Sequence, residues 1–204
     1  MPASWRGGRH RPPYNELFDA RRNTVQAMRN DEAKARRCPD GYPSRMNAAP
    51  LLALVSQVLV RHRLDAVVIG NAAAALQGSP VTTTDVDFMF RQTPTNLRKL
   101  KAVADDLEAM VLRPYYPASA LFRVVRDRDG LQLDFMAKVD GVRSFEALKA
   151  RATPVRFGRS TLLVASLRDI IRSKERAGRP QDLAVLPVLR KTLDEQEARK
   201  ASRG

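Results

Sequence analysis

The hydrophobic positions of this chain follow helical spacing in some segments and strand spacing in others. Apolar residues recur about every three to four positions over 51–62, which predicts an amphipathic helix. The short run 66–69 is wholly apolar and predicts a buried strand, whereas alternation over 86–90 predicts a strand with one apolar face and one carboxylate face. The same criteria predict helices over 72–76, 95–110, 144–150 and 182–200, and strands over 121–125, 131–136, 154–157 and 161–164.

Turn and capping residues separate these elements. The residues 127–130, Asp-Arg-Asp-Gly, lie between two strand patterns and predict a hairpin, and Gly158 predicts a second one. Ser166 is the expected N-cap of a further helix that stops at Gly178. Helices therefore alternate with short strands and hairpins. We expect an α+β fold in which helices flank a mixed β-sheet and the chain ends in a helical segment.

The chain has 204 residues, enough for one domain with an extension. Residues 1–45 contain Arg-Gly-Gly-Arg and Arg-Pro-Pro sequences and few apolar positions. We expect them to form a basic N-terminal extension that is partly helical or mobile. Residues 46–204 form the expected domain, with its core over 48–165 and its C-terminal helices over 166–200.

The charge of the chain narrows the class of partner. There are 36 Lys and Arg residues against 22 Asp and Glu, a net charge of +14, and 151–204 alone hold thirteen basic and six acidic residues. Such an excess attracts polyanions by releasing their counterions, so RNA is an expected partner. The single cysteine, Cys38, excludes an internal disulfide and a four-cysteine zinc site. Without an apolar run of about eighteen residues or a secretory pattern, we expect a cytoplasmic protein with no membrane partner.

Three aspartates carry the most specific chemical signal. Asp85 and Asp87 lie two apart on a predicted strand, so both carboxylates point to one face. Asp134 lies in another apolar strand and can meet them from a neighbouring position. Mg²⁺ or Mn²⁺ is the cofactor that such carboxylates hold together with substrate phosphates. Gly70 ends a strand and opens a helix, and the backbone N–H groups of such a turn favour an anion.

These residues resemble the polymerase-beta-like nucleotidyltransferase superfamily, and especially its bacterial members of the abortive-infection and toxin–antitoxin type. The similar segments are Gly70-Asn71, the stretch Gly-Ser-Pro-Val-Thr-Thr-Thr-Asp-Val-Asp over 78–87, Asp134, and the stretches 165–174 and 177–183. The resemblance covers roughly residues 48–190. It implies a nucleotidyltransferase core and metal-dependent transfer of a nucleoside monophosphate from an NTP to an acceptor hydroxyl, with release of pyrophosphate.

The resemblance also implies roles for individual residues. Gly70 and Asn71 hold the triphosphate, Asp85 and Asp87 bind the metals, Asp134 is a base or metal ligand, Lys174 neutralises phosphate charge, and Asp182 orients Lys174. Two features depart from the family pattern. Asn71 stands where Gly or Ser is usual, and Thr82-Thr83-Thr84 stands where many relatives have a basic residue before the aspartates.

Several alternatives stay open from the sequence alone. The favoured acceptor is an RNA 3′ end, with tRNA the favoured RNA, and the protein can be the toxin of a toxin–antitoxin pair. A protein side chain, a small molecule, or a catalytically silent module that binds nucleotide or RNA are the other readings. Lys174 can also belong to a solvated helix face, and Asp182 can serve as a helix N-terminal charge. Tyr115 and Tyr116 can stack on a base or pack within a loop.

Overall fold

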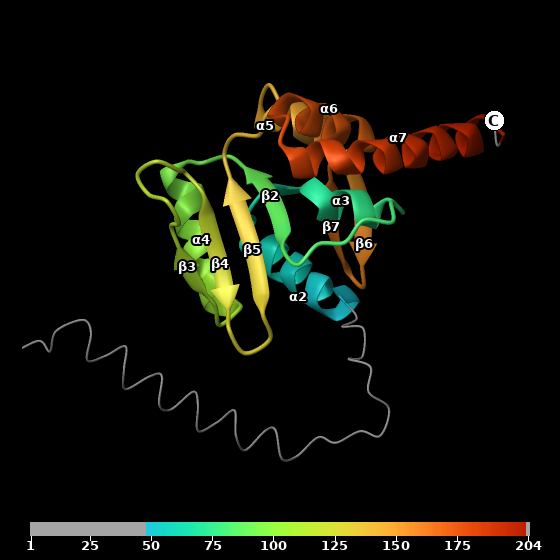
Figure 1. Ribbon diagram of the computed structural model, residues 1–204. Helices are drawn as coiled ribbons and strands as arrows, with labels where there is room; N and C mark the ends of the chain where they lie inside the picture. The colour runs from blue at the N-terminus through green and yellow to red at the C-terminus, as the bar shows by residue number, and fades with distance from the viewer. Residues whose placement is uncertain (1–47, 203–204) are drawn as a thin grey trace, which may run out of the picture. The chain divides into compact units, whose positions relative to one another are not determined.

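The computed structural model describes residues 48–202 (Figure 1), and the expected extension over 1–45 lies outside this range. Within the described residues, strands form one seven-stranded mixed sheet, and the predicted α+β class is confirmed. The strands are β1 (Ala66–Ile69), β2 (Val86–Phe90), β3 (Met110–Leu112), β4 (Phe122–Arg126), β5 (Leu131–Met136), β6 (Thr153–Phe157) and β7 (Ser160–Val164). The helices are α2 (Ala48–Arg61), α3 (Gly70–Leu76), α4 (Pro94–Asp106), α5 (Phe145–Arg151), α6 (Leu167–Ala177) and α7 (Pro180–Ala201).

The strand order in the sheet is β3-β4-β5-β2-β1-β7-β6. Strand β2 pairs with β5 in parallel, β1 pairs with β7 in parallel, and the other neighbours are antiparallel. Both predicted hairpins are present, β4–β5 and β6–β7, and Gly130 and Gly158 adopt positive φ in their turns. The sheet therefore places β2, which carries Asp87 and begins directly after Asp85, side by side with β5, which carries Asp134, near its centre.

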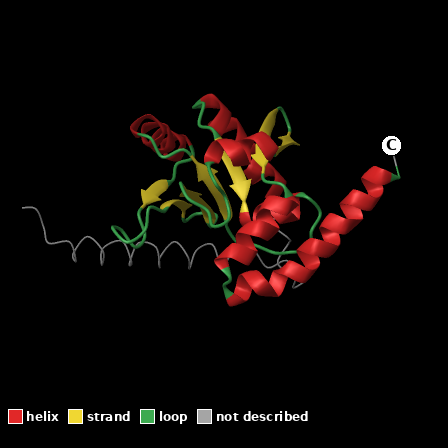
Figure 2. Cartoon of the chain, turned by 90° about the horizontal axis from the view of Figure 1, so that it is seen from above, coloured by secondary structure: helices red, strands yellow, loops and turns green. Residues whose placement is uncertain are grey.

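Helices cover both faces of the sheet (Figure 2). Helices α2 and α4 pack against each other on one face, where Phe88, Phe90 and Phe135 form an aromatic cluster in the core. The rings of Phe88 and Phe135 are stacked with their centres 4.8 Å apart. On the other face, α3 packs against β1, β2 and α6, and α6 packs against α7. This second face is the one toward which the carboxylates of β2 point, because they alternate with the buried phenylalanines.

Capping residues fix the ends of the helices much as the sequence predicts. The Ser166 hydroxyl accepts a hydrogen bond from the backbone N–H of Asp169 at the start of α6, and Gly178 ends that helix with φ of +64°. Ser144 caps α5 in the same way. Because Gly178 turns the chain sharply, α7 begins two residues later and returns beside α6.

One element differs from the sequence prediction. A helix was expected to run through Met110, but α4 ends at Asp106, and Glu108 adopts a positive φ of 52°. Residues Met110–Leu112 instead form β3, the edge strand that pairs with β4. This strand has three exposed residues and hence no alternation of buried and exposed positions to reveal it. In the described part of the chain, no helix combines the length and apolar character needed to cross a membrane.

Candidate active site

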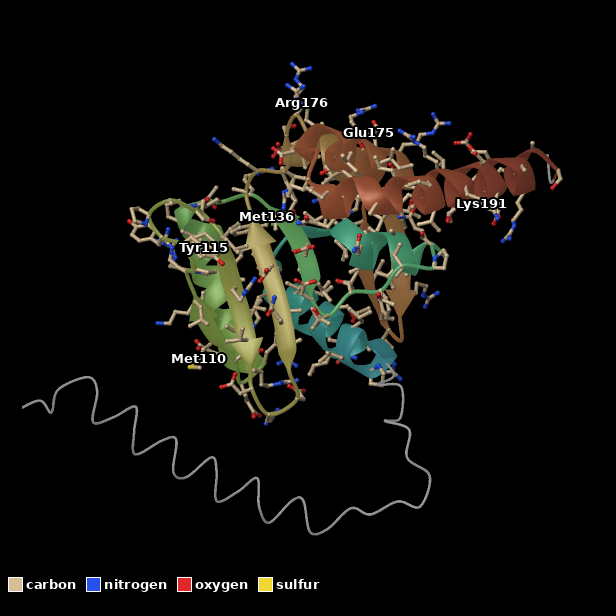
Figure 3. All side chains as sticks on the ribbon, viewed as in Figure 1. Met110, Tyr115, Met136, Glu175, Arg176 and Lys191 are labelled. Carbon is tan, nitrogen blue, oxygen red and sulfur yellow. The ribbon has the colours of Figure 1, made fainter. Side chains whose placement is uncertain are left out.

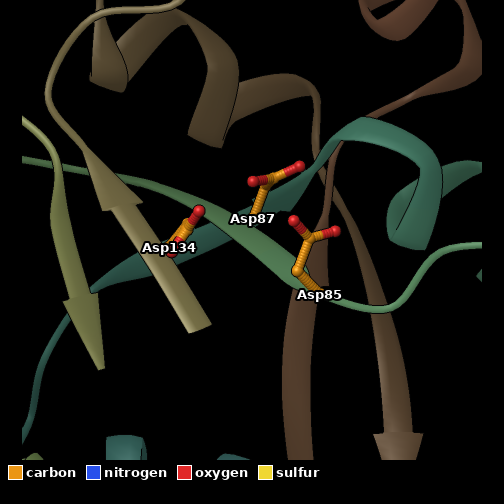
Figure 4. Close-up of side chains that lie close together, drawn as sticks. All are labelled: Asp85, Asp87 and Asp134. Atoms are coloured by element: carbon orange, nitrogen blue, oxygen red, sulfur yellow. The ribbon is translucent and has the colours of Figure 1, made fainter. Parts of the chain in front are cut away.

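The register of two parallel strands brings the three predicted carboxylates together. Asp87 on β2 is the direct Cα partner of Asp134 on β5, and Asp85 lies two residues before Asp87. Directly opposed residues and residues two apart share one face of a sheet. One oxygen from each carboxylate lies within 4.8 Å of the others, as Figure 4 illustrates. We refer to Asp85, Asp87 and Asp134 as the carboxylate cluster.

A glycine allows the main chain to approach this cluster closely. Ile69 on β1 is the Cα partner of Asp87 on β2. Gly70 follows Ile69 in the chain and therefore lies directly beside the Asp87 carboxylate. Gly70 has φ of +66°, and a Cβ atom at this position would lie only 2.5 Å from Asp87 Oδ2. Both the backbone conformation and the short distance therefore require glycine here.

The electrostatic state of the carboxylate cluster favours a bound cation. Burial, together with the charges of Asp85 and Asp134, raises the pKa of Asp87 from 3.8 to about 6, although Lys174 and Arg123 act in the opposite direction. Gathered carboxylates are destabilised by desolvation and mutual repulsion, and a proton or a metal ion relieves both. All the donors are carboxylate oxygens, the ligands that Mg²⁺ and Mn²⁺ prefer. The residues present thus fit the metal that the sequence implies.

Sequence reasoning missed the partner of Asp134. Arg123 on β4 donates from Nε to Asp134 Oδ1 at 2.8 Å and from Nη2 to Asp134 Oδ2 at 2.6 Å. Arg123 is the direct Cα partner of Asp134 in the β4–β5 hairpin, so its position follows from the hairpin register. The alternation within 122–126 was the signal that could have placed Arg123 on the carboxylate face. The hydrogen bonds that Arg123 donates to Asp134, together with the negative charge of that carboxylate, raise the pKa of the Arg123 guanidinium, although burial opposes this.

Polar residues to which the family resemblance gives no role hold Asp85. Thr83 donates its hydroxyl to Asp85 Oδ1 at 2.8 Å, and Gln132 donates to Asp85 Oδ2 at 3.3 Å. The threonine stretch that departs from the family pattern therefore holds Asp85 in place. Asn71 donates from Nδ2 to the Thr82 carbonyl at 3.5 Å, and its Oδ1 is buried without a hydrogen-bond partner.

Lys174 and Asp182 form an ion pair between the two C-terminal helices. Lys174 Nζ lies 2.9 Å from Asp182 Oδ1, and the side chains are only 10% and 13% exposed. Lys174 therefore does not belong to a solvated helix face. Asp182 lies in the first turn of α7, so it is both a helix N-terminal charge and the partner of Lys174. Arg179 Nε lies 3.4 Å from the second oxygen of Asp182.

A cavity of about 180 Å³ joins this ion pair to the carboxylate cluster. Its lining includes Gly70 and Asp87 on one side and Lys174, Arg179 and Asp182 on the other. Asn71, Asp85 and Asp134 are not part of this lining; the last two lie beside Asp87 on the sheet. On one side of Asp87 therefore lie Lys174, Arg179 and the main chain at Gly70. On the other side lie the carboxylates of Asp85 and Asp134.

Comparisons with known proteins bear on the fold. No family model and no curated protein matches the sequence. A presumed nucleotidyltransferase from Thermotoga maritima has a TM-score of 0.51 and 20% identity, over 76% of this chain and 98% of its own. The antibiotic-resistance factor ANT(2″)-Ia, in complex with adenylyl-2″-tobramycin, has a TM-score of 0.52 and 16% identity, over 77% of this chain and 97% of its own. This chain therefore has the fold found in solved nucleotidyltransferase structures.

Proposed function

We propose that the protein is a metal-dependent nucleotidyltransferase, which moves a nucleoside monophosphate from an NTP to an acceptor hydroxyl. The observation that carries this proposal is that Asp87 belongs both to a candidate metal site and to a candidate phosphate-binding cavity. Asp87 belongs to the carboxylate cluster and also lines the cavity that contains Gly70 and Lys174. A site that can hold a metal beside a pocket with a fixed lysine and an arginine suits the transfer of a phosphoryl group.

The cavity is the proposed site of the triphosphate. Lys174, held by Asp182, supplies a positive charge at a fixed position. Gly70 lets the main chain at the start of α3 lie directly beside the Asp87 carboxylate, since no Cβ atom separates the two. Asp85 and Asp87 would hold the metal ions, which when bound neutralise phosphate charge and favour attack by the acceptor hydroxyl.

Asp134 faces the proposed acceptor side of the site. The acceptor oxygen bonds to the α-phosphorus, the bond from that phosphorus to its bridging oxygen breaks, and pyrophosphate leaves with the electron pair. Because Arg123 donates to both oxygens of Asp134, the geometry favours Asp134 as a metal ligand over Asp134 as a base. The acceptor's proton then passes to solvent.

RNA is the favoured acceptor, and a tRNA 3′ end its favoured form. The support is electrostatic: the whole chain carries +14, with thirteen basic against six acidic residues over 151–204. Transfer of a nucleotide to tRNA would block its use in translation, which accords with a role as the toxin of a toxin–antitoxin pair.

Other acceptors are separate candidates. ANT(2″)-Ia was solved with an adenylylated small molecule, and that comparison raises a small-molecule acceptor for this chain. A polycationic drug requires an acidic pocket, whereas Arg123 and Lys174 flank the carboxylates here. Transfer to a protein side chain, such as that of a toxin or antitoxin partner, and a silent nucleotide- or RNA-binding module remain the alternatives.

Labelled nucleotide identifies the acceptor. The full chain is incubated with Mg²⁺, each α-³²P-labelled NTP in turn, and either total RNA or a protein extract. We expect label in a tRNA-sized band with at least one NTP. Label confined to a protein band would move the acceptor to a protein, and the absence of label from both fractions would count against transfer to macromolecules.

A further inference from the structure

Exposed apolar side chains concentrate at one edge of the sheet. Of the eight large hydrophobic residues that are exposed within 48–202, five fall in the seven residues from Met110 to Tyr116. Figure 3 labels Met110 and Tyr115 near the two ends of this segment. The proposed reaction does not use these side chains. A concentration of exposed apolar side chains on one part of a protein surface typically marks a binding site.

The strand register places part of this segment on the carboxylate face. Leu112 is the Cα partner of Arg123, Arg123 that of Asp134, and Asp134 that of Asp87. Four residues in one row across four strands point to the same face. With strands about 4.8 Å apart, Leu112 lies roughly 10 Å from Asp134. Met110 lies on the same face, two residues before Leu112.

The side of the cluster toward β3 is open. Helices α3 and α6 cover the face over β1 and β2, and Figure 1 shows no helix of the described chain in front of β4 and β5. The nucleotide cavity lies on the α6 side of Asp87. An acceptor therefore approaches the carboxylate cluster over β4 and β3, past Arg123, which covers Asp134. We call Met110, Leu112 and Tyr115 the β3 shelf.

The loop that carries Tyr115 is fixed to the core. The guanidinium of Arg113 lies 3.8 Å from the centre of the Tyr116 ring and 5.0 Å from that of the buried Phe122 ring. Tyr115 itself is 80% exposed. Tyr116 thus anchors the loop through Arg113, while Tyr115 presents its ring to solvent.

The charge around the β3 shelf favours an anionic ligand. Residues 110–126 include three arginines and neither aspartate nor glutamate. Arg126 is held by Asp129 and Arg123 by Asp134, which leaves Arg113, near Tyr116, as the arginine of this segment that pairs with an aromatic ring and not with a carboxylate. A ligand that combines flat apolar groups with negative charge matches this surface better than a polycation or a basic peptide does.

We infer that the β3 shelf binds the terminal bases of a single-stranded RNA 3′ end. Tyr115 stacks on a base, Leu112 and Met110 extend the apolar surface, and Arg113 attracts the backbone phosphates. This inference rests on the proposed function, since it supplies the site for the favoured acceptor. It goes beyond that function by assigning the residues that bind the acceptor.

A fluorescent base tests the inference without any chemistry. A single-stranded octaribonucleotide carries 2-aminopurine at its 3′ end, and a second probe carries it at the 5′ end. The full chain is titrated into each with Mg²⁺ and no NTP. We expect quenching of the 3′ probe alone, and a dissociation constant about tenfold higher for Tyr115→Ala, because base–aromatic stacking contributes about 1–3 kcal/mol. Tyr115→Phe keeps the ring and should bind within about twofold of the wild type.

A control separates stacking from general apolar exposure. Val60→Ala removes another exposed side chain, on α2, and should leave the quenching unchanged. Equal quenching of both probes, unchanged binding by Tyr115→Ala, or no quenching by the wild-type chain would each overturn the inference. If RNA is labelled in the transfer assay while Tyr115→Ala binds normally, the proposed function stands and this site for the acceptor fails. If instead the 3′ probe is quenched as expected but no RNA is labelled in the transfer assay, the RNA-binding site stands and the proposed function fails.

Discussion

Gly70 and Asp87 are in a contact that no other residue at position 70 would allow. The Asp87 carboxylate occupies the space that a side chain would need, since a Cβ atom would lie 2.5 Å from its Oδ2. The contact joins the first turn after β1 to strand β2. The proposed triphosphate site and the proposed metal site therefore depend on each other's geometry.

Gly70→Ala should displace Asp87 and abolish nucleotide transfer. It also forces alanine into a positive φ, which costs about 1–3 kcal/mol of folding free energy. Gly158→Ala is the matched control, because Gly158 has φ of +61° and nothing within 4 Å of its added Cβ. Urea denaturation should show a larger loss for Gly70→Ala than for Gly158→Ala. Equal losses with transfer intact would mean that the Asp87 contact is unimportant.

Asp87→Asn should stabilise the metal-free protein at neutral pH. The folded-state pKa of about 6 exceeds the reference value of 3.8, so between these values the folded state holds a proton that the unfolded state has lost. Wild-type stability relative to Asp87→Asn therefore falls as pH rises through this window, by up to about 3 kcal/mol. Denaturation in EDTA from pH 4 to pH 8 measures the difference.

The exposed Asp194→Asn is the control for that pH series and should show no comparable trend. Added Mn²⁺ should restore stability to the wild type and not to Asp87→Asn, since the metal binds the folded state preferentially. A stability difference that stays constant across the pH range would contradict the raised pKa of Asp87.

Lys174→Met should weaken NTP binding and destabilise the fold. Removal of one partner from a buried ion pair costs about 3–5 kcal/mol, because the other charge is left buried. The double variant Lys174→Met/Asp182→Leu should recover stability without recovering NTP affinity. Calorimetric titration with a non-hydrolysable NTP measures the affinity, and Arg176→Met, on the exposed side of α6, is the control. NTP affinity that returns with stability would assign the pair a purely structural role.

Arg123→Met should leave the buried Asp134 carboxylate without its partner. We expect a loss of about 3–5 kcal/mol in metal-free buffer and partial recovery when Mn²⁺ is added, since the metal replaces the lost positive charge. Arg128→Met breaks an exposed pair with Glu108 and should change stability by less than about 1 kcal/mol. If Mn²⁺ stabilises Arg123→Met no more than the wild type, Asp134 is not a metal ligand.

Much of this fold follows from local pattern. The apolar run 66–69, the alternation around Phe88 and Phe90, and the caps at Ser144 and Ser166 each determine an element through nearby residues alone. Strand β3 was missed because three exposed residues at a sheet edge carry no burial pattern. Its existence depends on pairing with β4 across the loop that joins the two strands, a contact outside the three residues of β3 themselves.

In the candidate site, too, some features follow from the local sequence and others depend on how the strands pair. The spacing of Asp85 and Asp87 predicted their shared face, but that Asp134 is the exact partner of Asp87 depends on the register of β2 and β5. The fork that Arg123 makes to Asp134 depends on hairpin register and side-chain rotamers. The role of Lys174 was ambiguous because α6 contains several charged residues, and the sequence alone does not show which of them faces the core.

The most direct measurement is Mg²⁺-dependent transfer of labelled nucleotide by the wild-type chain and by Asp87→Asn, each checked for folding by thermal denaturation. We predict label on RNA with the wild type, its loss with EDTA, and its loss in Asp87→Asn with a melting temperature equal to or above that of the wild type. Transfer by a folded Asp87→Asn at the wild-type rate would contradict the account, because the carboxylate cluster would then not be the catalytic centre.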